Sequence, residues 1–215
     1  MPPARVLTVD ELVERALALA EAGSRQLLGI AGAPGAGKST LAARIVAEVG
    51  SAACLVPMDG FHLAQSQLVR LGRADRKGAV DTFDANGYVS LLRRLRRLEP
   101  TSVYAPEFRR ELEEPVAGAI EVLPSVRLVV TEGNYLLLED FPWQEIRPLL
   151  HEAWFLDLDA EVRHRRLTAR HEAFGRSPEQ ARAWALGSDE SNAALITPTA
   201  GRADLVARLS ESPAA

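Results

Sequence analysis

The segment LLGIAGAPGAGKST, residues 27–40, has four glycines ahead of a lysine and two hydroxyl side chains. From Gly32 to Ser39 the spacing is G-x-x-x-x-G-K-S, the P-loop pattern. Glycines let the backbone turn so that successive N–H groups point at one phosphate chain. Lys38 can then reach the outer phosphates, and the Ser39 hydroxyl can bind the accompanying Mg²⁺. The segment predicts a nucleotide phosphate site made by Gly32, Ala33, Pro34, Gly35, Ala36, Gly37, Lys38, Ser39 and Thr40.

Lysine usage supports this prediction. The chain has 25 lysines and arginines, of which only Lys38 and Lys77 are lysines. In a chain that otherwise uses arginine, a lysine in the P-loop indicates that a compact ammonium is needed there. The residues before the loop are typical of a buried strand and those after it of a helix. The positive N-terminal end of that helix adds to the attraction for phosphate.

Two acidic residues follow predicted strands at the sheet edge that carries the P-loop. Asp59 comes two residues after a strand over 53–57, where a carboxylate can orient an attacking hydroxyl and accept its proton. The alternative is a turn aspartate, because Asp-Gly is a common turn pair. Glu132 ends a strand over 127–133 and is a candidate ligand for Mg²⁺, its waters or the acceptor. The alternative for Glu132 is a turn or capping acid.

Arginines share one face of a helix predicted over 160–173. Arg163, Arg166 and Arg170 recur at i, i+3 and i+7. Arginines on a mobile helix can close over a transferring phosphoryl group and balance its charge. We therefore predict a helical lid over about 160–176, with Arg166 and Arg170 as catalytic candidates. The alternative is an ordinary solvated helix face.

Predicted strands and helices alternate along the chain around these residues. Thr8 and Glu11 have the spacing of a capping box, followed by apolar residues at helical intervals. Predicted strands occupy 26–31, 53–57, 127–133, 153–159 and the segment ADLVARL; predicted helices occupy 39–49, 84–98, 160–173 and 178–187. Residues 60–83 are predicted to form a long loop, and the segment 104–122 has no assignment. The alternation predicts an α/β fold of the P-loop NTPase type, a doubly wound parallel sheet with helices on both faces.

The length and composition of the chain predict a single domain, and its net charge predicts no general attraction to polyanions. The 215 residues are 47% hydrophobic, enough to bury a full core, so we expect a single domain over 1–215. The formal net charge of −4 gives no global attraction to nucleic acid or to an anionic membrane. The lone Cys54 suits a reducing compartment, and no signal-peptide pattern or apolar run of membrane-spanning length occurs. We expect a cytoplasmic protein that binds neither nucleic acid nor membrane; a homodimer is among the oligomeric states that the sequence allows.

Two further features of the sequence, an arginine-rich segment and the four histidines, predict no additional binding or metal site. The segment LLRRLRRLEP places four leucines on one side: Leu91, Leu92, Leu95 and Leu98. This pattern predicts an amphipathic surface helix. RNA binding is the weaker alternative, because no aromatic residues lie among its arginines. The four histidines are scattered without metal-ligand spacing, so we expect no zinc site.

Together the motifs resemble the phosphoribulokinase, uridine kinase and type I pantothenate kinase group of P-loop kinases. The segments that carry the resemblance are GAPGAGKST (32–40), MDGFH (58–62), KGAVDTFD (77–84), VVTEGNYLL (129–137), FLDLDAEVRHRRLTAR (155–170) and SNAALITPTAGRADLV (191–206). The last segment is similar to the tail of pantothenate-kinase-like members. The resemblance covers nearly the whole chain after residue 25.

The resemblance implies that Asp59 is the catalytic base and that Arg166 and Arg170 cover the phosphates. Candidate acceptor-binding residues are Asp59, His62, Tyr104, Phe108, Glu132 and Asn192. After Asp59 the chain has Gly-Phe-His, closer to pantothenate kinases than the Ser-Phe-Tyr of uridine kinases. Arg109 stands where many relatives have an aspartate, so their substrate contacts cannot be transferred to that position.

These features favour a kinase that uses ATP and Mg²⁺ to phosphorylate a hydroxyl of a small metabolite, such as a nucleoside, a pantothenate-like compound or a sugar. A nucleoside monophosphate kinase is an alternative, because lid arginines also suit a phosphorylated acceptor. A GTP switch or another non-kinase nucleotide-binding protein is a second alternative. Neither lysine lies in an Asn-Lys-x-Asp guanine motif, which counts against the switch. The negative net charge disfavours a P-loop protein that acts on nucleic acid.

Overall fold

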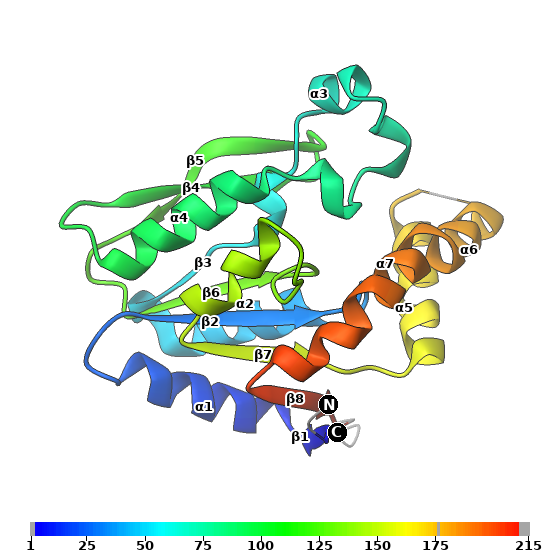
Figure 1. The fold of residues 1–215 in the computed structure, drawn as a ribbon. Helices are drawn as coiled ribbons and strands as arrows, with labels where there is room; N and C mark the ends of the chain where they lie inside the picture. The colour runs from blue at the N-terminus through cyan, green and yellow to red at the C-terminus, as the bar shows by residue number, and fades with distance from the viewer. Residues whose placement is uncertain (1–2, 176, 211–215) are drawn as a thin grey trace.

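Six parallel strands form the main sheet of the computed structural model, which describes residues 3–175 and 177–210 (Figure 1). The strand order is β1-β8-β7-β2-β6-β3. The strands are β1 (Arg5–Leu7), β2 (Gln26–Gly32), β3 (Ala53–Leu55), β6 (Leu128–Gly133), β7 (Glu152–Leu156) and β8 (Leu205–Leu209). Because β2 lies between β7 and β6, the P-loop that follows it sits in the middle of the carboxyl edge. The predicted doubly wound α/β fold is confirmed.

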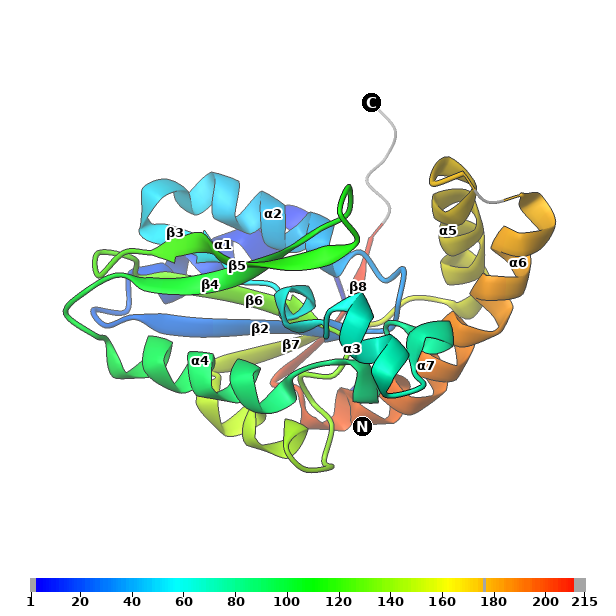
Figure 2. The same ribbon diagram turned by 90° about the horizontal axis from the view of Figure 1, so that it is seen from above.

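Helices cover both faces of this sheet (Figures 1 and 2). The α-helices are α1 (Val9–Ala20), α2 (Lys38–Val49), α3 (Gln65–Arg70), α4 (Ala85–Arg97), α5 (Ala160–Ala173), α6 (Pro178–Leu186) and α7 (Ser188–Ile196). One apolar core joins α1 and α2 to strand residues such as Leu28 and Ile30, and the other joins α4 to residues such as Leu27 and Ala31. Side chains alternate along a strand, so β2 supplies both cores.

Capping side chains fix where several helices begin. The Thr8 hydroxyl accepts the Glu11 N–H at 3.1 Å, and the Glu11 carboxylate accepts the Thr8 N–H at 2.7 Å. This reciprocal pair is the predicted capping box of α1. Asp84 caps α4 by accepting the Gly87 N–H at 2.9 Å, and Asp159 caps α5 in the same way. Each cap stabilises its helix by about 1 kcal/mol.

The unassigned segment 104–122 forms an antiparallel hairpin apart from the main sheet. Its strands are β4 (Val103–Arg109) and β5 (Glu114–Val122). The register shifts between Ala105 and Glu107, at Pro106, which has no N–H to give to the ladder. The hairpin packs against the 3-10 turn Met58–Phe61, and a Cβ on Gly60 would lie 2.2 Å from the Pro106 carbonyl oxygen. The hairpin therefore supports the turn that carries Asp59.

Other departures from the predicted elements are local. Residues 60–83 contain α3 and short 3-10 turns rather than only a loop, and β1 and α7 were not predicted. Leu91, Leu92 and Leu95 are buried on α4 as expected, but Leu98 ends the helix with φ 57° and is half exposed. The left-handed conformation turns Leu98 away from the apolar side of α4. Within the described residues, none of the helices has the length and apolar character needed to span a membrane.

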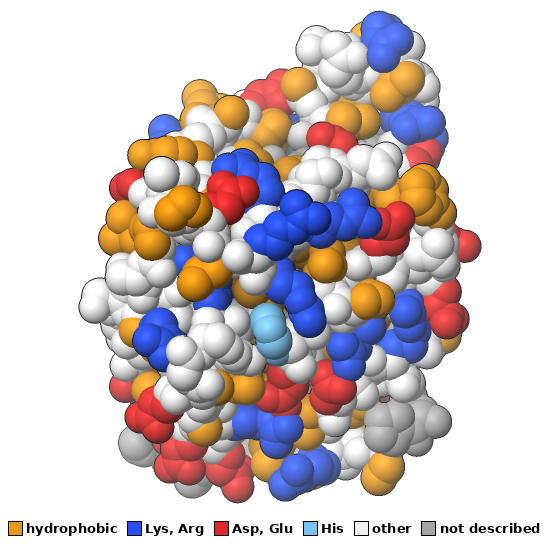
Figure 3. Space-filling view, turned by 60° about the vertical axis from the view of Figure 1, so that its left-hand side comes forward, with side chains coloured by type: hydrophobic (Ala, Val, Ile, Leu, Met, Phe, Trp, Pro, Cys, Tyr) orange, Lys and Arg blue, Asp and Glu red, His pale blue; other side chains and the backbone are white. Residues whose placement is uncertain are grey.

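The arginines of α4 lie at the surface. Figure 3 brings forward the end of the molecule where α4 ends and shows Lys and Arg side chains gathered there, with acidic side chains beside them. Arg94 pairs with Glu99 at 3.0 Å, and Arg93 pairs with Glu145. Arg96 donates to the carbonyl oxygen of Leu149 at 2.6 Å. These internal contacts agree with an amphipathic surface helix.

Candidate active site

A cleft of about 990 Å³ opens at the carboxyl edge of the sheet. It is lined by the P-loop, the turn Met58–Phe61, the tip of the β4–β5 hairpin and helices α5, α6 and α7. Ligands of parallel α/β sheets bind at this edge. The volume is at the upper end of the ~300–1,000 Å³ typical of small-molecule sites. The cleft therefore has room for a nucleotide and a second small molecule.

The P-loop backbone is shaped by glycines. Gly35 and Gly37 have φ values of 81° and 98°, a left-handed conformation that glycine adopts without strain. A Cβ on Gly32 would lie 2.8 Å from the carbonyl oxygen of Leu156 in β7, so the neighbouring strand leaves no room for a side chain. Helix α2 begins at Lys38, directly after Gly37. Its first N–H groups, which have no partner inside the helix, therefore lie at the loop.

Lys38 is buried at the floor of the cleft, with 8% of its surface exposed. Its ammonium donates to the Asn134 Oδ1 at 2.8 Å and to the Ala33 carbonyl oxygen at 3.1 Å. Burial lowers the pKa of Lys38, whereas the charges of Glu132 and Asp59 raise it. Water competes little for an ammonium in such a place, so an anion that reaches it is held strongly.

Ser39 and Glu132 form an oxygen-donor pair beside Lys38. The Ser39 hydroxyl donates to the Glu132 Oε1 at 2.9 Å. Burial raises the pKa of Glu132, and the ammonium of Lys38 opposes this shift. Among the residues that the structure describes, no cluster of three or more His, Cys, Asp or Glu could hold a metal alone. One hydroxyl and one carboxylate nevertheless fit Mg²⁺, which prefers oxygen donors and keeps waters and phosphates as most of its ligands.

Asp59 lies half-buried in the turn after β3 and lines the cleft. Asp59 shares this cleft with Lys38 and Glu132, and its charge raises the pKa of both. Within residues 3–175 and 177–210, no group bonds to this carboxylate; only its main-chain oxygen has a side-chain partner. The Asp59 carboxylate is therefore available to a ligand.

His62 belongs to an aromatic wall of the cleft. Its ring centroid lies 4.1 Å from that of Phe83 and 4.8 Å from that of Phe108. The His62 Nδ1 lies 2.8 Å from the Asp59 carbonyl oxygen, which can only accept, so Nδ1 carries the proton. Burial lowers the pKa of His62 and favours the neutral ring. The wall offers an apolar surface to a carbon skeleton and leaves Nε2 as an acceptor.

The remaining candidate acceptor-binding residues, Asn192 and Tyr104, differ in whether they line the cleft. Asn192 of α7 lines the cleft, with its Oδ1 2.9 Å from the Tyr135 hydroxyl. Tyr104 does not line it: the side chain is 56% exposed, and its hydroxyl donates to Glu121 at 3.2 Å on the outside of the hairpin. Along β4 the alternation of exposed and less exposed positions changes phase near Pro106, so Phe108 faces the cleft and Tyr104 faces away. Tyr104 therefore lies outside the cleft that the other acceptor candidates line.

Helix α5 carries Arg166 and Arg170 along the cleft. Both side chains are exposed, and neither forms an ion pair or hydrogen bond with another residue in the described part of the chain. Leu167 lies against the P-loop, since a Cβ on Gly35 would be 2.9 Å from the Leu167 Cγ. Two unpaired cations therefore lie next to the phosphate loop. Residue 176, the last of the predicted lid, lies outside the described residues.

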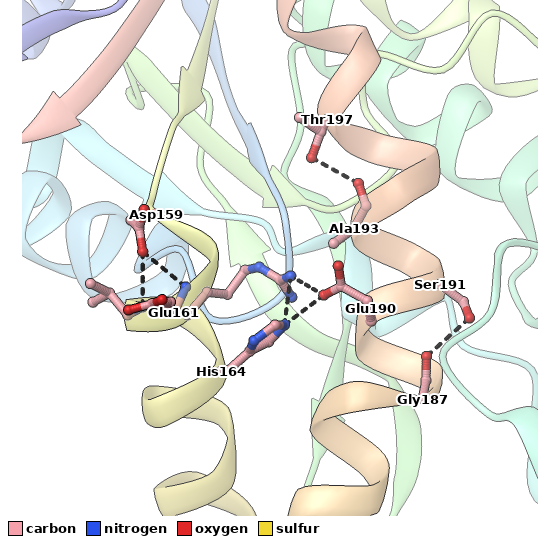
Figure 4. A network of polar contacts seen from close by, with 10 residues as sticks. Asp159, Glu161, His164, Gly187, Glu190, Ser191, Ala193 and Thr197 are labelled. Atoms are coloured by element: carbon pink, nitrogen blue, oxygen red, sulfur yellow. Dashed lines mark hydrogen bonds and ion pairs between the residues drawn. The ribbon is translucent and has the colours of Figure 1, made fainter.

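Arg163 does not share this environment. It is 3% exposed and pairs with Glu190 of α7, whose carboxylate is also 2.7 Å from the His164 Nε2 (Figure 4). Further along α5, the His171 Nε2 lies 2.8 Å from Asp189, the neighbour of Glu190. The expectation of one solvated or phosphate-facing row of three arginines is wrong for Arg163. Its role is to join α5 to α7.

Sequence reasoning missed several cleft residues: Lys77, Arg110, Asn134 and Asp189. Two of them carried a visible signal. Asn134 follows the strand-end acid by two positions, and Lys77 is the second of only two lysines. Arg110 and Asp189 carried none, because the hairpin turn and α7 that position them were not predicted.

Comparison with known proteins identifies the family. The profile of the Phosphoribulokinase / Uridine kinase family matches residues 27–212. The chain belongs to this family. It is 37% identical over 178 residues to "Putative uridine kinase C227.14" of Schizosaccharomyces pombe, which covers 77% of this chain and 74% of that protein. It is 31% identical over 193 residues to YggC of Escherichia coli, covering 87% and 79%.

Solved structures agree. A structure from Silicibacter sp. TM1040, "putative fructose transport system kinase", has a TM-score of 0.81 at 33% identity and covers 94% of this chain and 98% of that one. YFH7 of Saccharomyces cerevisiae has a TM-score of 0.81 at 19% identity, covering 96% and 100%, which shows a shared fold. The protein is a P-loop kinase of the uridine kinase family with a single α/β domain, and the resemblance inferred from the motifs is confirmed.

Proposed function

We propose that the protein transfers the γ-phosphoryl group of ATP to a hydroxyl group of a small metabolite. The observation that supports this most strongly is the unbonded Asp59 carboxylate, which faces the same cleft as the P-loop. A nucleotide-binding switch needs no base at this place. A kinase with an alcohol acceptor does, because the hydroxyl must be oriented and must lose its proton.

Phosphate binding is assigned to the P-loop N–H groups and to Lys38. The Lys38 ammonium bonds to the neutral oxygens of Asn134 and Ala33 in this structure. A phosphate oxygen is a stronger acceptor because it is charged. Lys38 therefore exchanges at least one of these partners for the nucleotide, and Asn134 keeps the ammonium in place until then.

Ser39 and Glu132 are the residues that would hold Mg²⁺, Ser39 directly and Glu132 directly or through water. Their mutual hydrogen bond at 2.9 Å opens when they do so. When bound there, the ion would balance negative charge on the nucleotide phosphates and so favour transfer of the γ-phosphoryl group, with ADP as the leaving group. Glu132 is buried near the ammonium of Lys38, so its carboxylate stays close to the place proposed for the ion.

Asp59 is the proposed general base. It places the acceptor oxygen in line with the γ-phosphorus and takes its proton as the new P–O bond forms. In a loose transition state the proton leaves late, so a carboxylate of ordinary basicity suffices. The aromatic wall of His62 and Phe108 supports the carbon skeleton on the same side of the cleft.

Arg166 and Arg170 are proposed to act as the lid. Their guanidinium groups have no partner among the described residues, whereas Arg163 at the start of the helix is fixed by Glu190. Arg163 and His171 tie α5 to Glu190 and Asp189 of α7, so the two helices would move together and bring the two free arginines onto the phosphates. Closure would balance the negative charge of the transition state and keep water from the γ-phosphate.

The test is acceptor-dependent release of ADP from magnesium ATP. The panel includes pantothenate, nucleosides, sugars and nucleoside monophosphates, followed by a crude metabolite extract. We expect at least one member to raise ADP release and to appear as a phosphomonoester by ³¹P NMR. If neither the panel nor the extract raises release above that of ATP alone, the proposal fails.

A further inference from the structure

A second group of cations lines the same cleft, on elements other than the P-loop and α5. Lys77 precedes α4, and Arg110 lies at the tip of the β4–β5 hairpin. Lys77 lies over Phe108, whose ring packs against His62 beside Asp59. The transfer described above assigns a role to neither residue.

Lys77 is held in place but not neutralised. Its side chain is 18% exposed, and its ammonium lies 5.1 Å from the centroid of the Phe108 ring. It donates to the main-chain oxygen of Glu113, and the carboxylate of that residue is 4.0 Å away and 70% exposed. A long, exposed ion pair contributes little. An ammonium has three N–H donors, so two remain for a ligand in the cleft.

Arg110 is held in a similar way. Its guanidinium lies over the ring of Phe174, with 5.4 Å between Cζ and the ring centroid. Phe174 is the residue that ends α5, so this contact joins the hairpin tip to the lid helix. Among residues 3–175 and 177–210, no carboxylate pairs with Arg110. Stacking on an aromatic face leaves the N–H edge of the guanidinium free for an anion.

We propose that Lys77 and Arg110 form an anion subsite for the acceptor, which is a small hydroxylated carboxylate or phosphate ester rather than a neutral nucleoside. This inference rests on the proposed kinase function. The nucleotide phosphates already have Lys38, Arg166 and Arg170, so the second pair serves the other substrate. The anionic group binds Lys77 while the hydroxyl of the same molecule reaches Asp59.

The subsite also suits ordered closure. Arg110 already stacks on Phe174 at the end of the lid helix, so an acceptor anion bound by Lys77 and Arg110 would add a link between the acceptor and that helix. Binding of the acceptor therefore favours the closed lid and commits ATP to the acceptor rather than to water.

The first experiment compares matched acceptors with and without the anion. The pairs are glycerate and glycerol, pantothenate and pantothenol, and fructose 6-phosphate and fructose, with uridine and cytidine as neutral nucleosides. We expect kcat/KM for at least one anion to exceed that of its neutral counterpart by about tenfold or more. The first two pairs report on carboxylates and the third on phosphate esters, so the panel also separates these two sources of charge.

The second experiment assigns the preference to residues. For the best anion, Lys77→Met and Arg110→Gln should each raise the acceptor KM about 10- to 100-fold, the effect of removing one hydrogen bond to a charged group. The KM for magnesium ATP should change by less than about threefold. Lys77→Arg keeps the charge and should recover part of the loss. The matched control is Arg109→Gln, because Arg109 is exposed, pairs with Glu107 and does not line the cleft.

The outcomes separate this inference from the kinase proposal. A neutral nucleoside turned over better than every anion would overturn the subsite and leave the kinase standing. So would a Lys77→Met variant whose ratio of anionic to neutral kcat/KM equals that of the parent. If the parent protein turned over none of the compounds, both the anion subsite and the proposed kinase function would be overturned.

Discussion

Replacement of Lys38 by methionine separates the stability of the fold from nucleotide binding. Methionine keeps a flexible chain of similar length but removes the ammonium. In the structure the ammonium makes two hydrogen bonds, to Asn134 and Ala33, and burial lowers its pKa. The substitution loses these bonds but also removes a poorly hydrated charge. Because the two effects oppose each other, we expect the free energy of unfolding to change by less than about 2 kcal/mol.

The effect of Lys38→Met on ATP binding should be much larger. The ammonium can give charge-assisted hydrogen bonds to oxygens of the outer phosphates, each worth about 1.5–3 kcal/mol. Two such bonds correspond to roughly 10²–10⁴-fold in Kd. AMP lacks the outer phosphates, so its Kd should change by less than about threefold.

Calorimetric titration with ATP, ADP and AMP in the presence of Mg²⁺ measures these differences, and thermal unfolding of the free protein measures stability. The matched control is Lys77→Met, which removes the only other lysine of the chain at a position outside the P-loop. Its affinity for ATP should equal that of the parent. An ATP affinity of Lys38→Met within threefold of the parent, or an equal loss for AMP, would refute the assignment of Lys38 to the outer phosphates.

Three further predictions concern the lid, the support of Asp59 and the aromatic wall. Amide hydrogen exchange over 160–173 should slow when a non-hydrolysable ATP analogue binds, because the nucleotide phosphates give Arg166 and Arg170 partners; equal exchange in both states would reject the lid. Gly60→Ala should lower the free energy of unfolding by about 1–3 kcal/mol, because its Cβ would be 2.2 Å from the Pro106 oxygen, whereas Gly201→Ala, with open space around it, should be neutral in the same urea titration. Burial lowers the pKa of His62 from 6.5, so the unfolded chain binds more protons than the folded one below that pH, and this group removes stability as pH falls. His62→Phe should therefore lose less stability than the parent between pH 7 and pH 5, and an identical loss in the two proteins would contradict the burial of a neutral ring.

Much of the main sheet and the P-loop part of the cleft could be predicted because their signals are local. The capping box at Thr8, the apolar strands and the glycine spacing of the P-loop each lie within a few residues. The order of parallel strands then brings Asp59 and Glu132 to the edge that holds Lys38, as their positions after predicted strands indicated.

The hairpin, α7 and the environment of Arg163 depend on distant contacts. Segment 104–122 contains prolines and charged residues, and its paired strands pack against α4 and the turn Met58–Phe61. The change of phase in β4 near Pro106 leaves Phe108, and not Tyr104, facing the cleft. The spacing of Arg163, Arg166 and Arg170 predicted that the three arginines share one face. Arg163 is instead buried and paired with Glu190, which lies on a helix that was not predicted. These features depend on contacts between distant segments, which the periodicity of apolar residues along the sequence does not predict.

The most direct test of the proposed chemistry is the Asp59→Asn variant, measured for both nucleotide affinity and turnover. Asparagine keeps the shape and one acceptor oxygen but cannot take a proton, so Kd for magnesium ATP should change by less than about threefold while kcat falls by roughly 10²–10⁴. Asp75→Asn, the same substitution at an exposed position outside the cleft, should leave both values unchanged. A parallel fall in affinity and turnover would instead assign Asp59 to Mg²⁺. Turnover of Asp59→Asn near that of the parent would contradict the assignment of Asp59 as the base.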